Sequence, residues 1–168
     1  AIDRSIVRTA DQGENWDCLP ALPSHVLSLA VLDREHLVAG TLAHGCLVWD
    51  DRAGTWQERN QGLYGRLPVG IIARRSHELL VADYSGTVLH SPDGGSTWQR
   101  ALLDRGIAQF AGGPTGPVFA LALDTLLRSS DGHEWEPVRD IEELSESAWL
   151  LASDDGGTVC LVQYTLEP

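Results

Sequence analysis

The sequence predicts an all-β fold, a β-propeller of about four blades, each a four-stranded antiparallel sheet. A tryptophan motif recurs along the chain, with Trp16, Trp56, Trp98 and Trp135 spaced by 40, 42 and 37 residues. A period near 40 residues is typical of propellers and other repeat architectures. Short apolar runs that end in turn residues precede the motifs in phase, which indicates strands rather than helices. Four strands per repeat correspond to one propeller blade.

Each repeat is expected to contain strands A, B, C and D, with the tryptophan motif between C and D. The apolar runs are expected to form A strands at 26–31, 69–73 and 107–111, B strands at 37–39, 79–82 and 118–122, and C strands that include 47–48, 88–89 and 126–127. Complete blades are therefore expected over about 25–60, 67–102 and 106–140. Only residues 140–147 could form a helical turn.

The two ends of the chain are expected to share one blade. Residues 1–20 contain a C–D pair, and residues 148–168 contain an A–B pair. Joining them would remove a free sheet edge and give a single domain over residues 1–168. Two alternatives stay open. Two chains could form an eight-bladed ring in which each supplies the other's missing strands, or the chain could be part of a larger propeller.

The tryptophan motif is interpreted as a turn. In the copy Ser91–Trp98, glycine tolerates positive φ, the aspartate can accept backbone N–H groups, and the serine hydroxyl can add a second local bond. The tryptophan then packs beside the turn and shields it. The residues assigned this structural role in the four copies are Thr9, Asp11, Gly13, Trp16, Asp51, Trp56, Ser91, Asp93, Gly95, Trp98, Ser129, Asp131, Gly132 and Trp135.

The pattern [ST]-x-D-x-G-x-x-W resembles the Asp-box of the BNR repeat families. These include sialidases, sortilin-type receptors, some xyloglucan-cleaving glycosidases and photosystem assembly factors. The stretch Asn60–Leu63 also resembles a spacer common in such repeats. The second copy departs from the pattern at Trp49 and Ala53, and the fourth is one residue shorter. The resemblance covers essentially the whole chain and implies a propeller with its boxes on the outer edge of the blades, without implying a chemistry.

Composition limits the classes of partner. The formal net charge is −12, and all 12 basic residues are arginines, so nucleic acid and anionic lipid are disfavoured. No apolar run is long enough to span a membrane and no signal segment is visible, so a soluble protein of unknown compartment is expected. The three cysteines, Cys18, Cys46 and Cys160, are far apart and are expected to be buried free thiols.

Ligands of propellers bind near the D–A and B–C loops at one face of the ring. The candidate binding residues in these loops are His44, Asn60, Tyr64, Arg66, Asp83, Tyr84, Asp104, Arg105 and Asp124. No catalytic residue, cofactor or metal site is predicted. His36 and His77 occupy equivalent turns of successive blades and are expected to lie too far apart to share a metal.

These observations favour a non-enzymatic propeller that serves as a binding or scaffold module for a protein partner. The acidity of the chain suggests a partner with a basic surface, and a homodimer is a further alternative. The alternative class is a carbohydrate-binding or sialidase-like propeller, with sugar contacts at Asn60, Tyr64 and Tyr84. The triplet Arg66–Leu67–Pro68 resembles the Arg-x-Pro motif of sialidases, but it follows the second box, whereas in that family the motif precedes the first.

Overall fold

The computed structural model describes residues 5–63, 67–74, 77–101, 107, 109–122, 125–140, 148–152 and 157–163. Over these ranges the chain forms strands and turns, and none of the described residues is in an α-helix. The segment 141–147, for which a helical turn was the expectation, lies outside them. The all-β fold with four-stranded antiparallel sheets is therefore confirmed.

The described strands form three four-stranded sheets in which the strand order follows the chain. The first contains β3 (Val26–Val31), β4 (His36–Thr41), β5 (Gly45–Asp50) and β6 (Thr55–Glu58). The second contains β7 (Pro68–Ala73), β8 (Leu79–Asp83), β9 (Val88–Ser91) and β10 (Gln99–Ala101). The third contains β11 (Gln109–Gly112), β12 (Val118–Leu121), β13 (Thr125–Ser129) and β14 (Glu136–Asp140). Each sheet is an antiparallel meander, which needs only short turns between strands.

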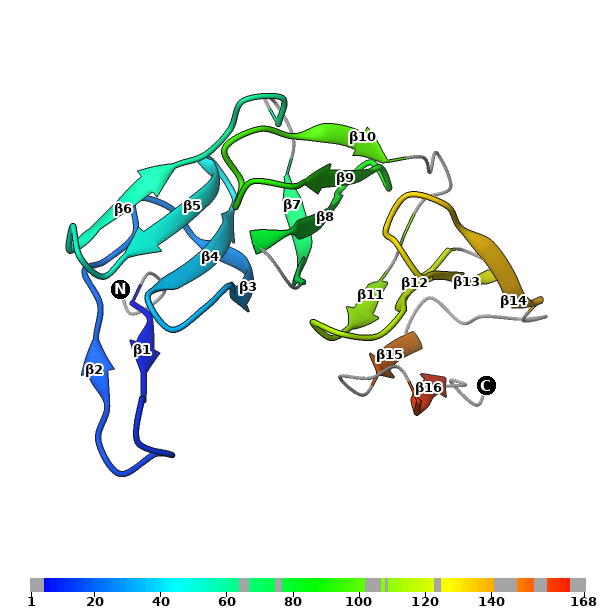
Figure 1. The fold of residues 1–168 in the computed structure, drawn as a ribbon, viewed down its shortest axis with the longest axis horizontal. Coiled ribbons are helices and arrows are strands. Elements are labelled where there is room, and N and C mark those ends of the chain that lie inside the picture. The colour runs from blue at the N-terminus through cyan, green and yellow to red at the C-terminus, as the bar shows by residue number, and fades with distance from the viewer. Residues whose placement is uncertain are drawn as a thin grey trace, which may run out of the picture.

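The three sheets stand side by side in an arc, like the blades of a propeller (Figure 1). The first strands of successive sheets, β3, β7 and β11, contact one another along the inner side of this arc. The fourth strands, β6, β10 and β14, lie on its outer side. The turns between strands therefore gather at two faces of the arc, where side chains from successive blades can meet.

Burial on both faces explains why the second strands are continuous apolar runs. Every residue of β8 is buried. Leu79 and Val81 pack with Val38 and Val48 of the first blade, whereas Leu80 and Ala82 pack with residues of the third blade that include Val118 and Ala120. Successive side chains of a strand point to opposite faces, so one apolar strand contributes to two interfaces between blades.

The terminal strands form two further antiparallel pairs. These are β1 (Val7–Arg8) with β2 (Asp17–Cys18), and β15 (Ala148–Ala152) with β16 (Val159–Gln163). Among the described strands, no strand of one pair is hydrogen-bonded to a strand of the other. The two pairs lie at opposite ends of the arc (Figure 1), with β15 beside β11. Among the described strands the two pairs therefore do not form the expected shared blade, since they stand at the two ends of the arc and not beside each other.

The face of the first blade that lies toward the N-terminal pair is only partly covered. Its outer part, which includes Leu37 and Leu47, packs with Ile6 and Leu19 from the segment that carries β1 and β2. Its inner part on β3 remains open, with Leu27 39%, Leu29 47% and Val31 66% exposed. Leu29 pairs with Ala39 and Val31 with Leu37, so they share the face that the N-terminal pair covers elsewhere.

Candidate functional site

The candidate binding residue His44, in the B–C turn of the first blade, lines a groove beside the first two blades. This groove has a volume of about 650 Å³ and is lined by residues that include Leu42, His44, Glu58 and Leu67. Leu42 exposes 47% of its surface. The His44 ring and the Glu58 carboxylate form a pair at 2.8 Å on the rim. The groove thus combines an apolar side chain with a charged edge.

Asn60 lines the same groove, but its side chain holds the turn together. The Cys46 N–H donates to Asn60 Oδ1 (2.9 Å), and Asn60 Nδ2 donates to the His44 carbonyl (2.8 Å). Gly45 has a φ of 63°, and a Cβ at this position would overlap the Asn60 amide. Both polar ends of the amide are therefore engaged within the protein, which makes Asn60 a positioning residue for the loop of His44.

Asp83 and Tyr84 lie in the corresponding turn of the second blade. Asp83 is buried and accepts hydrogen bonds from the Thr87 N–H (2.9 Å) and the Ser85 hydroxyl (2.6 Å), so its carboxylate organises the turn. The neighbouring Tyr84 is 79% exposed. Its N–H donates to the carbonyl of Leu67 (2.9 Å), which places the tyrosine beside the groove. Tyr84 is the more available of the two for a ligand.

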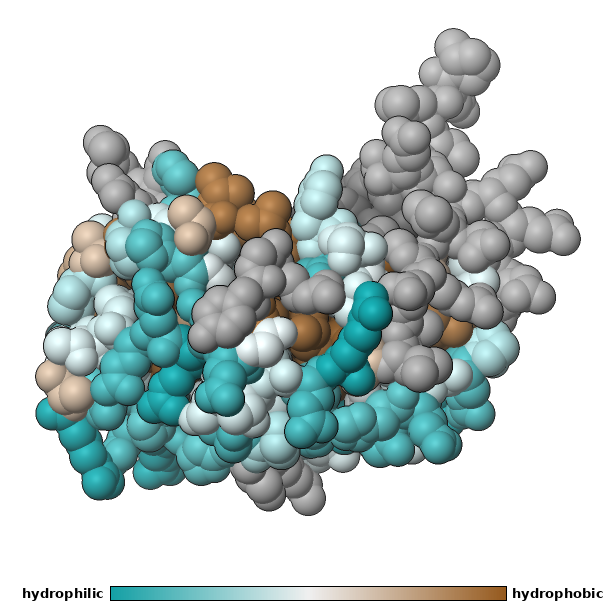
Figure 2. Space-filling view, turned by 90° about the horizontal axis from the view of Figure 1, so that it is seen from above, coloured by the Kyte–Doolittle hydropathy of each residue, from teal (hydrophilic) through white to brown (hydrophobic). Residues whose placement is uncertain are grey.

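The other candidate binding residues, Tyr64, Arg66, Asp104, Arg105 and Asp124, lie outside the described residues. The structure therefore brings His44 and Asn60 to one groove and Tyr84 to its border. Figure 2 shows that the molecule seen from above is mainly hydrophilic, with apolar residues gathered in small patches.

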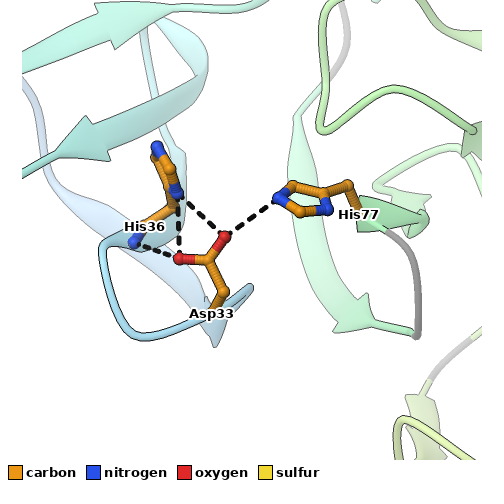
Figure 3. Close-up of side chains that lie close together, drawn as sticks. All are labelled: Asp33, His36 and His77. Carbon is orange, nitrogen blue, oxygen red and sulfur yellow. Dashed lines mark hydrogen bonds and ion pairs between the residues drawn. The ribbon is translucent and has the colours of Figure 1, made fainter.

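A second group of polar side chains lies between the turns of the first two blades. Asp33 lies in the turn between β3 and β4, His36 is the first residue of β4, and His77 comes from the segment before β8. The Asp33 carboxylate lies 2.9 Å from His36 Nδ1 and 3.0 Å from His77 Nε2. Figure 3 shows the two imidazoles approaching this carboxylate from two sides. The expectation that His36 and His77 lie too far apart to share a metal is wrong, because adjacent blades bring them together and the ligand atoms of Asp33, His36 and His77 lie within 4.8 Å of one another.

The Asp33 carboxylate is held in its ionised form. Partial burial opposes ionisation, but hydrogen bonds from the His36 ring and from the backbone N–H groups of Glu35 and His36 outweigh it. The pKa of Asp33 is accordingly below its ordinary value. The cluster therefore presents an anionic carboxylate between two imidazoles.

A related cluster lies between the second and third blades. His90 Nε2 contacts Glu78 Oε1 at 2.7 Å, and the rings of His90 and His133 are 4.2 Å apart. Here the carboxylate already has a cationic partner, since Arg74 Nε lies 3.2 Å from Glu78 Oε2. Arg74 also donates to the Ser130 carbonyl at 2.9 Å and so links the two blades directly.

The tryptophan motifs form hydrogen-bonded turns, and one residue of the third copy, Ser96, also lines the groove. In the third copy, the Gly95 N–H donates to Ser91 Oγ and the Thr97 N–H to Asp93 Oδ1, both at 2.8 Å. The first copy repeats this arrangement, where hydrogen bonds from the backbone and side chain of Asn15 lower the pKa of Asp11 to about 2. These carboxylates accept hydrogen bonds from the backbone N–H groups of their own turns.

In the shorter fourth copy, the hydroxyl and the carboxylate of the motif again accept backbone N–H groups of the turn. The Gly132 N–H donates to Ser129 Oγ at 2.8 Å, and the N–H groups of Glu134 and His133 donate to Asp131 at 2.9 and 2.8 Å. These bonds lower the pKa of Asp131 to about 2.

The second copy is organised differently from the sequence assignment. Asp50, not Asp51, accepts the turn N–H groups of Arg52 (2.9 Å) and Ala53 (3.1 Å). Asp51 instead forms an ion pair with Arg8 at 2.7 Å and accepts the indole N–H of Trp49 at 2.6 Å. The reason is that Trp49 replaces the hydroxyl residue, so the turn closes on the preceding carboxylate.

The cysteines offer no common site. Cys46 is buried, and burial raises the pKa of its thiol to about 12, so it stays protonated. Cys18 and Cys160 are free and exposed, which corrects the expectation that all three thiols are buried. The described part of the chain contains no helix that is long and apolar enough to cross a membrane.

The arrangement of four-stranded antiparallel blades in an arc defines the fold class as a β-propeller, and solved structures of this class are similar to it. YCF48 bound to D1 peptide has a TM-score of 0.61 and 16% sequence identity, with 79% of this chain and 48% of that chain covered. YCF48 from Cyanidioschyzon merolae has a TM-score of 0.57 and 18% identity, with 71% of this chain and 39% of that chain covered.

At these identities the likeness concerns the fold alone, and this chain spans less than half the length of either YCF48 chain. No protein-family model and no curated protein sequence matches the chain.

Proposed function

We propose that this chain is a non-enzymatic propeller module that binds a polypeptide segment in the groove beside Leu42 and His44. The observation that carries the proposal is the groove itself, which is about 650 Å³ in volume and has a half-exposed leucine at its edge. Concave surfaces with an apolar lining and a few polar groups are the usual ligand sites of proteins. A propeller of similar fold, YCF48, has been solved bound to a D1 peptide, which supports polypeptide as the ligand class.

The net charge of the chain favours a basic and partly apolar segment as the partner, while the groove itself is lined by one carboxylate, Glu58, and one guanidinium, Arg59. The chain has a formal net charge of −12, and Glu58 on the rim is 59% exposed in its side chain. An acidic surface attracts basic segments and raises their rate of association. Leu42 provides apolar area in the groove, and the exposed Tyr84 belongs to the turn whose N–H donates to the Leu67 carbonyl. Aromatic residues of this kind often dominate the binding energy of an interface.

Binding of a selected peptide tests this function. A phage-displayed library of random 12-residue peptides is selected on the purified chain, and the enriched peptide is measured by fluorescence anisotropy. Leu42→Ser and Tyr84→Ala should each weaken binding by about tenfold or more, because the first removes an apolar side chain that lines the groove and the second removes an exposed ring from the turn bonded to Leu67. Val138→Ser is the matched control, since Val138 is 50% exposed on β14 of another blade.

Failure to enrich any peptide would overturn the proposal, as would a peptide whose affinity is unchanged in both groove variants. A glycan array tests the carbohydrate alternative, for which Tyr84 is the exposed candidate. Binding of a glycan that Tyr84→Ala abolishes would favour that alternative. Asn60 contributes little to it, because both ends of its amide are engaged by Cys46 and His44.

We further propose that two copies of this chain assemble into one ring. The N-terminal pair β1–β2 corresponds to strands C and D of a blade, and the C-terminal pair β15–β16 corresponds to strands A and B. The β15–β16 pair of a second copy would complete the blade that β1–β2 begins. Two copies would then supply six complete and two composite blades, within the four to eight that propellers typically have.

The exposed apolar row on β3 supports the β15–β16 pair of a second copy as the segment that packs there. Leu27, Leu29 and Val31 lie on the inner strand, where an A–B pair would stand in the preceding blade. The outer part of the same face is already covered by Ile6 and Leu19. An added pair would therefore continue an existing interface, and it would also cover the open edge of β1–β2.

The mass in solution tests the assembly. Light scattering coupled to size exclusion should give about 36 kDa, twice the 18.2 kDa of one chain. Leu29→Asp should give 18.2 kDa with an unchanged circular dichroism spectrum, because a buried carboxylate would face β15 of the partner. Val138→Asp should remain dimeric. A wild-type mass of 18.2 kDa at micromolar concentration, or a Leu29→Asp variant that stays dimeric, would contradict the assembly.

A further inference from the structure

The cluster of Asp33, His36 and His77 has no role in the proposed peptide binding or in the proposed assembly. Each of the three residues offers one ligand atom, and these atoms all lie within 4.8 Å of one another. They come from two different blades (Figure 3). Two imidazoles and one carboxylate form a donor set that suits zinc and similar late first-row divalent ions.

Both oxygens of Asp33 lie 2.9 Å from His36 Nδ1, and each also has a partner that the other lacks. Oδ1 accepts the backbone N–H groups of Glu35 at 2.7 Å and His36 at 2.8 Å, which fixes the orientation of the carboxylate. Oδ2 faces His36 Nδ1 at 2.9 Å and His77 Nε2 at 3.0 Å. Outer hydrogen bonds of this kind orient the carboxylates that bind metals in proteins. One oxygen is thus anchored by the turn while the other points between the imidazoles.

The spacing of these donors fits a small ion after a slight expansion. Zinc binds nitrogen and oxygen at about 2.0–2.2 Å, so donors in a tetrahedral site lie roughly 3.3–3.5 Å apart. The present separations from Asp33 are 2.9 and 3.0 Å. The side chains of Asp33, His36 and His77 are 31%, 30% and 59% exposed, which leaves room for the imidazoles to move outward and for water to complete the coordination.

The cluster of Glu78, His90 and His133 provides an internal comparison. Its carboxylate is already paired with Arg74 at 3.2 Å, and a guanidinium at this distance opposes a second cation. His90 is also only 8% exposed in its side chain, so an ion would reach it less easily. The two clusters therefore differ in whether the carboxylate already has a cationic partner and in how exposed the imidazoles are. Both differences favour metal binding at the cluster of Asp33.

We propose that Asp33, His36 and His77 form a zinc site that ties the first blade to the second. His36 Nδ1, His77 Nε2 and Asp33 Oδ2 supply the protein ligands, and water supplies the remaining position. An ion held this way binds the folded arrangement of two blades and not the unfolded chain, so it stabilises the fold. The site is separate from the groove, because none of its ligands is among the residues that line the groove.

Titration of the purified, chelator-treated chain with zinc chloride tests the site by calorimetry. The wild type should bind one zinc ion per chain with saturation. His77→Asn should weaken this binding by roughly tenfold or more, because it removes one imidazole ligand. Asparagine is chosen because His77 has a φ of 66°, a conformation that asparagine adopts readily. His36→Gln should have a similar effect and tests the ligand from the first blade.

Two further histidine variants make the result specific. His25→Ala, which changes an exposed histidine outside both clusters, should leave zinc binding unchanged. His133→Ala should also leave zinc binding unchanged, because His133 belongs to the cluster of Glu78, where Arg74 opposes the binding of a second cation. The proposal is overturned if the wild type shows no saturable binding at micromolar zinc. It is also overturned if His77→Asn and His36→Gln bind as the wild type does, or if His133→Ala alone abolishes binding.

Discussion

At the scale of single residues, two of the motif tryptophans connect their blade to the segment that precedes it. Trp98 is 5% exposed, and its indole N–H donates to the Arg59 carbonyl at 2.9 Å. Trp56 makes the equivalent bond to the Pro20 carbonyl, also at 2.9 Å. Trp16 is 60% exposed and donates instead to Gly13 in its own turn, at 3.2 Å. The same motif residue is therefore buried or exposed according to what lies beside its blade.

This difference predicts unequal contributions to stability. Trp98→Ala should lower the free energy of unfolding by about 3–5 kcal/mol, because it leaves a cavity at the contact between two blades. Trp16→Ala should change it by less than about 1 kcal/mol, since that ring is largely in solvent. Denaturant unfolding followed by circular dichroism measures both. A loss well under about 1 kcal/mol for Trp98→Ala would contradict a structural role of the motif.

A close backbone contact explains why a glycine, Gly62, stands in the segment before the second blade. Gly62 has a φ of 94°, and a Cβ at this position would overlap the carbonyl oxygen of Trp98. The Trp98 N–H also donates to the Gln61 carbonyl at 2.8 Å. The stretch Asn60–Leu63 is thus shaped by its contact with the next blade, and it orients the loop of the groove at the same time.

At the scale of elements, the sequence was sufficient to predict the strands. The run Leu79–Ala82 is apolar at every position because β8 is covered on both faces, and its turn residues mark both ends. The A–B pair predicted within residues 148–168 contains β15 and β16. Strand positions follow from local patterns of apolar and turn residues, which the sequence carries directly.

The candidate site was less predictable, because the partner of a loop side chain depends on the fold. Asp83 and Asn60 are predicted as binding residues, yet the Asp83 side chain bonds to its own turn and the Asn60 side chain to the loop of His44. Sequence alone does not tell whether a polar loop residue faces its backbone or a ligand. His36 and His77 were separated in the prediction because the sequence gives no distance between blades. Their equivalent places in successive repeats are the signal from which their proximity could have been inferred.

At the scale of the whole molecule, the net charge and the exposed apolar row on β3 have opposite effects on the association of two copies of the chain. The arc leaves an apolar row on β3 open, which favours association with an apolar partner surface. The formal net charge of −12 opposes association of two identical chains. The same charge favours a basic peptide in the groove. The two proposed interactions therefore have electrostatic contributions of opposite sign.

Salt should separate these two interactions. The screening length falls from about 30 Å at 0.01 M salt to about 8 Å at 0.15 M. Raising the salt concentration over this range should strengthen self-association, because it screens repulsion between two acidic chains. It should weaken binding of a basic peptide, because it screens attraction. Sedimentation equilibrium measures the first and fluorescence anisotropy the second, each at both salt concentrations. Self-association that weakens with salt would indicate that ion pairs, not the apolar row of β3, hold the two copies together. Peptide binding that is insensitive to salt would remove the acidic surface as the reason for choosing a basic partner.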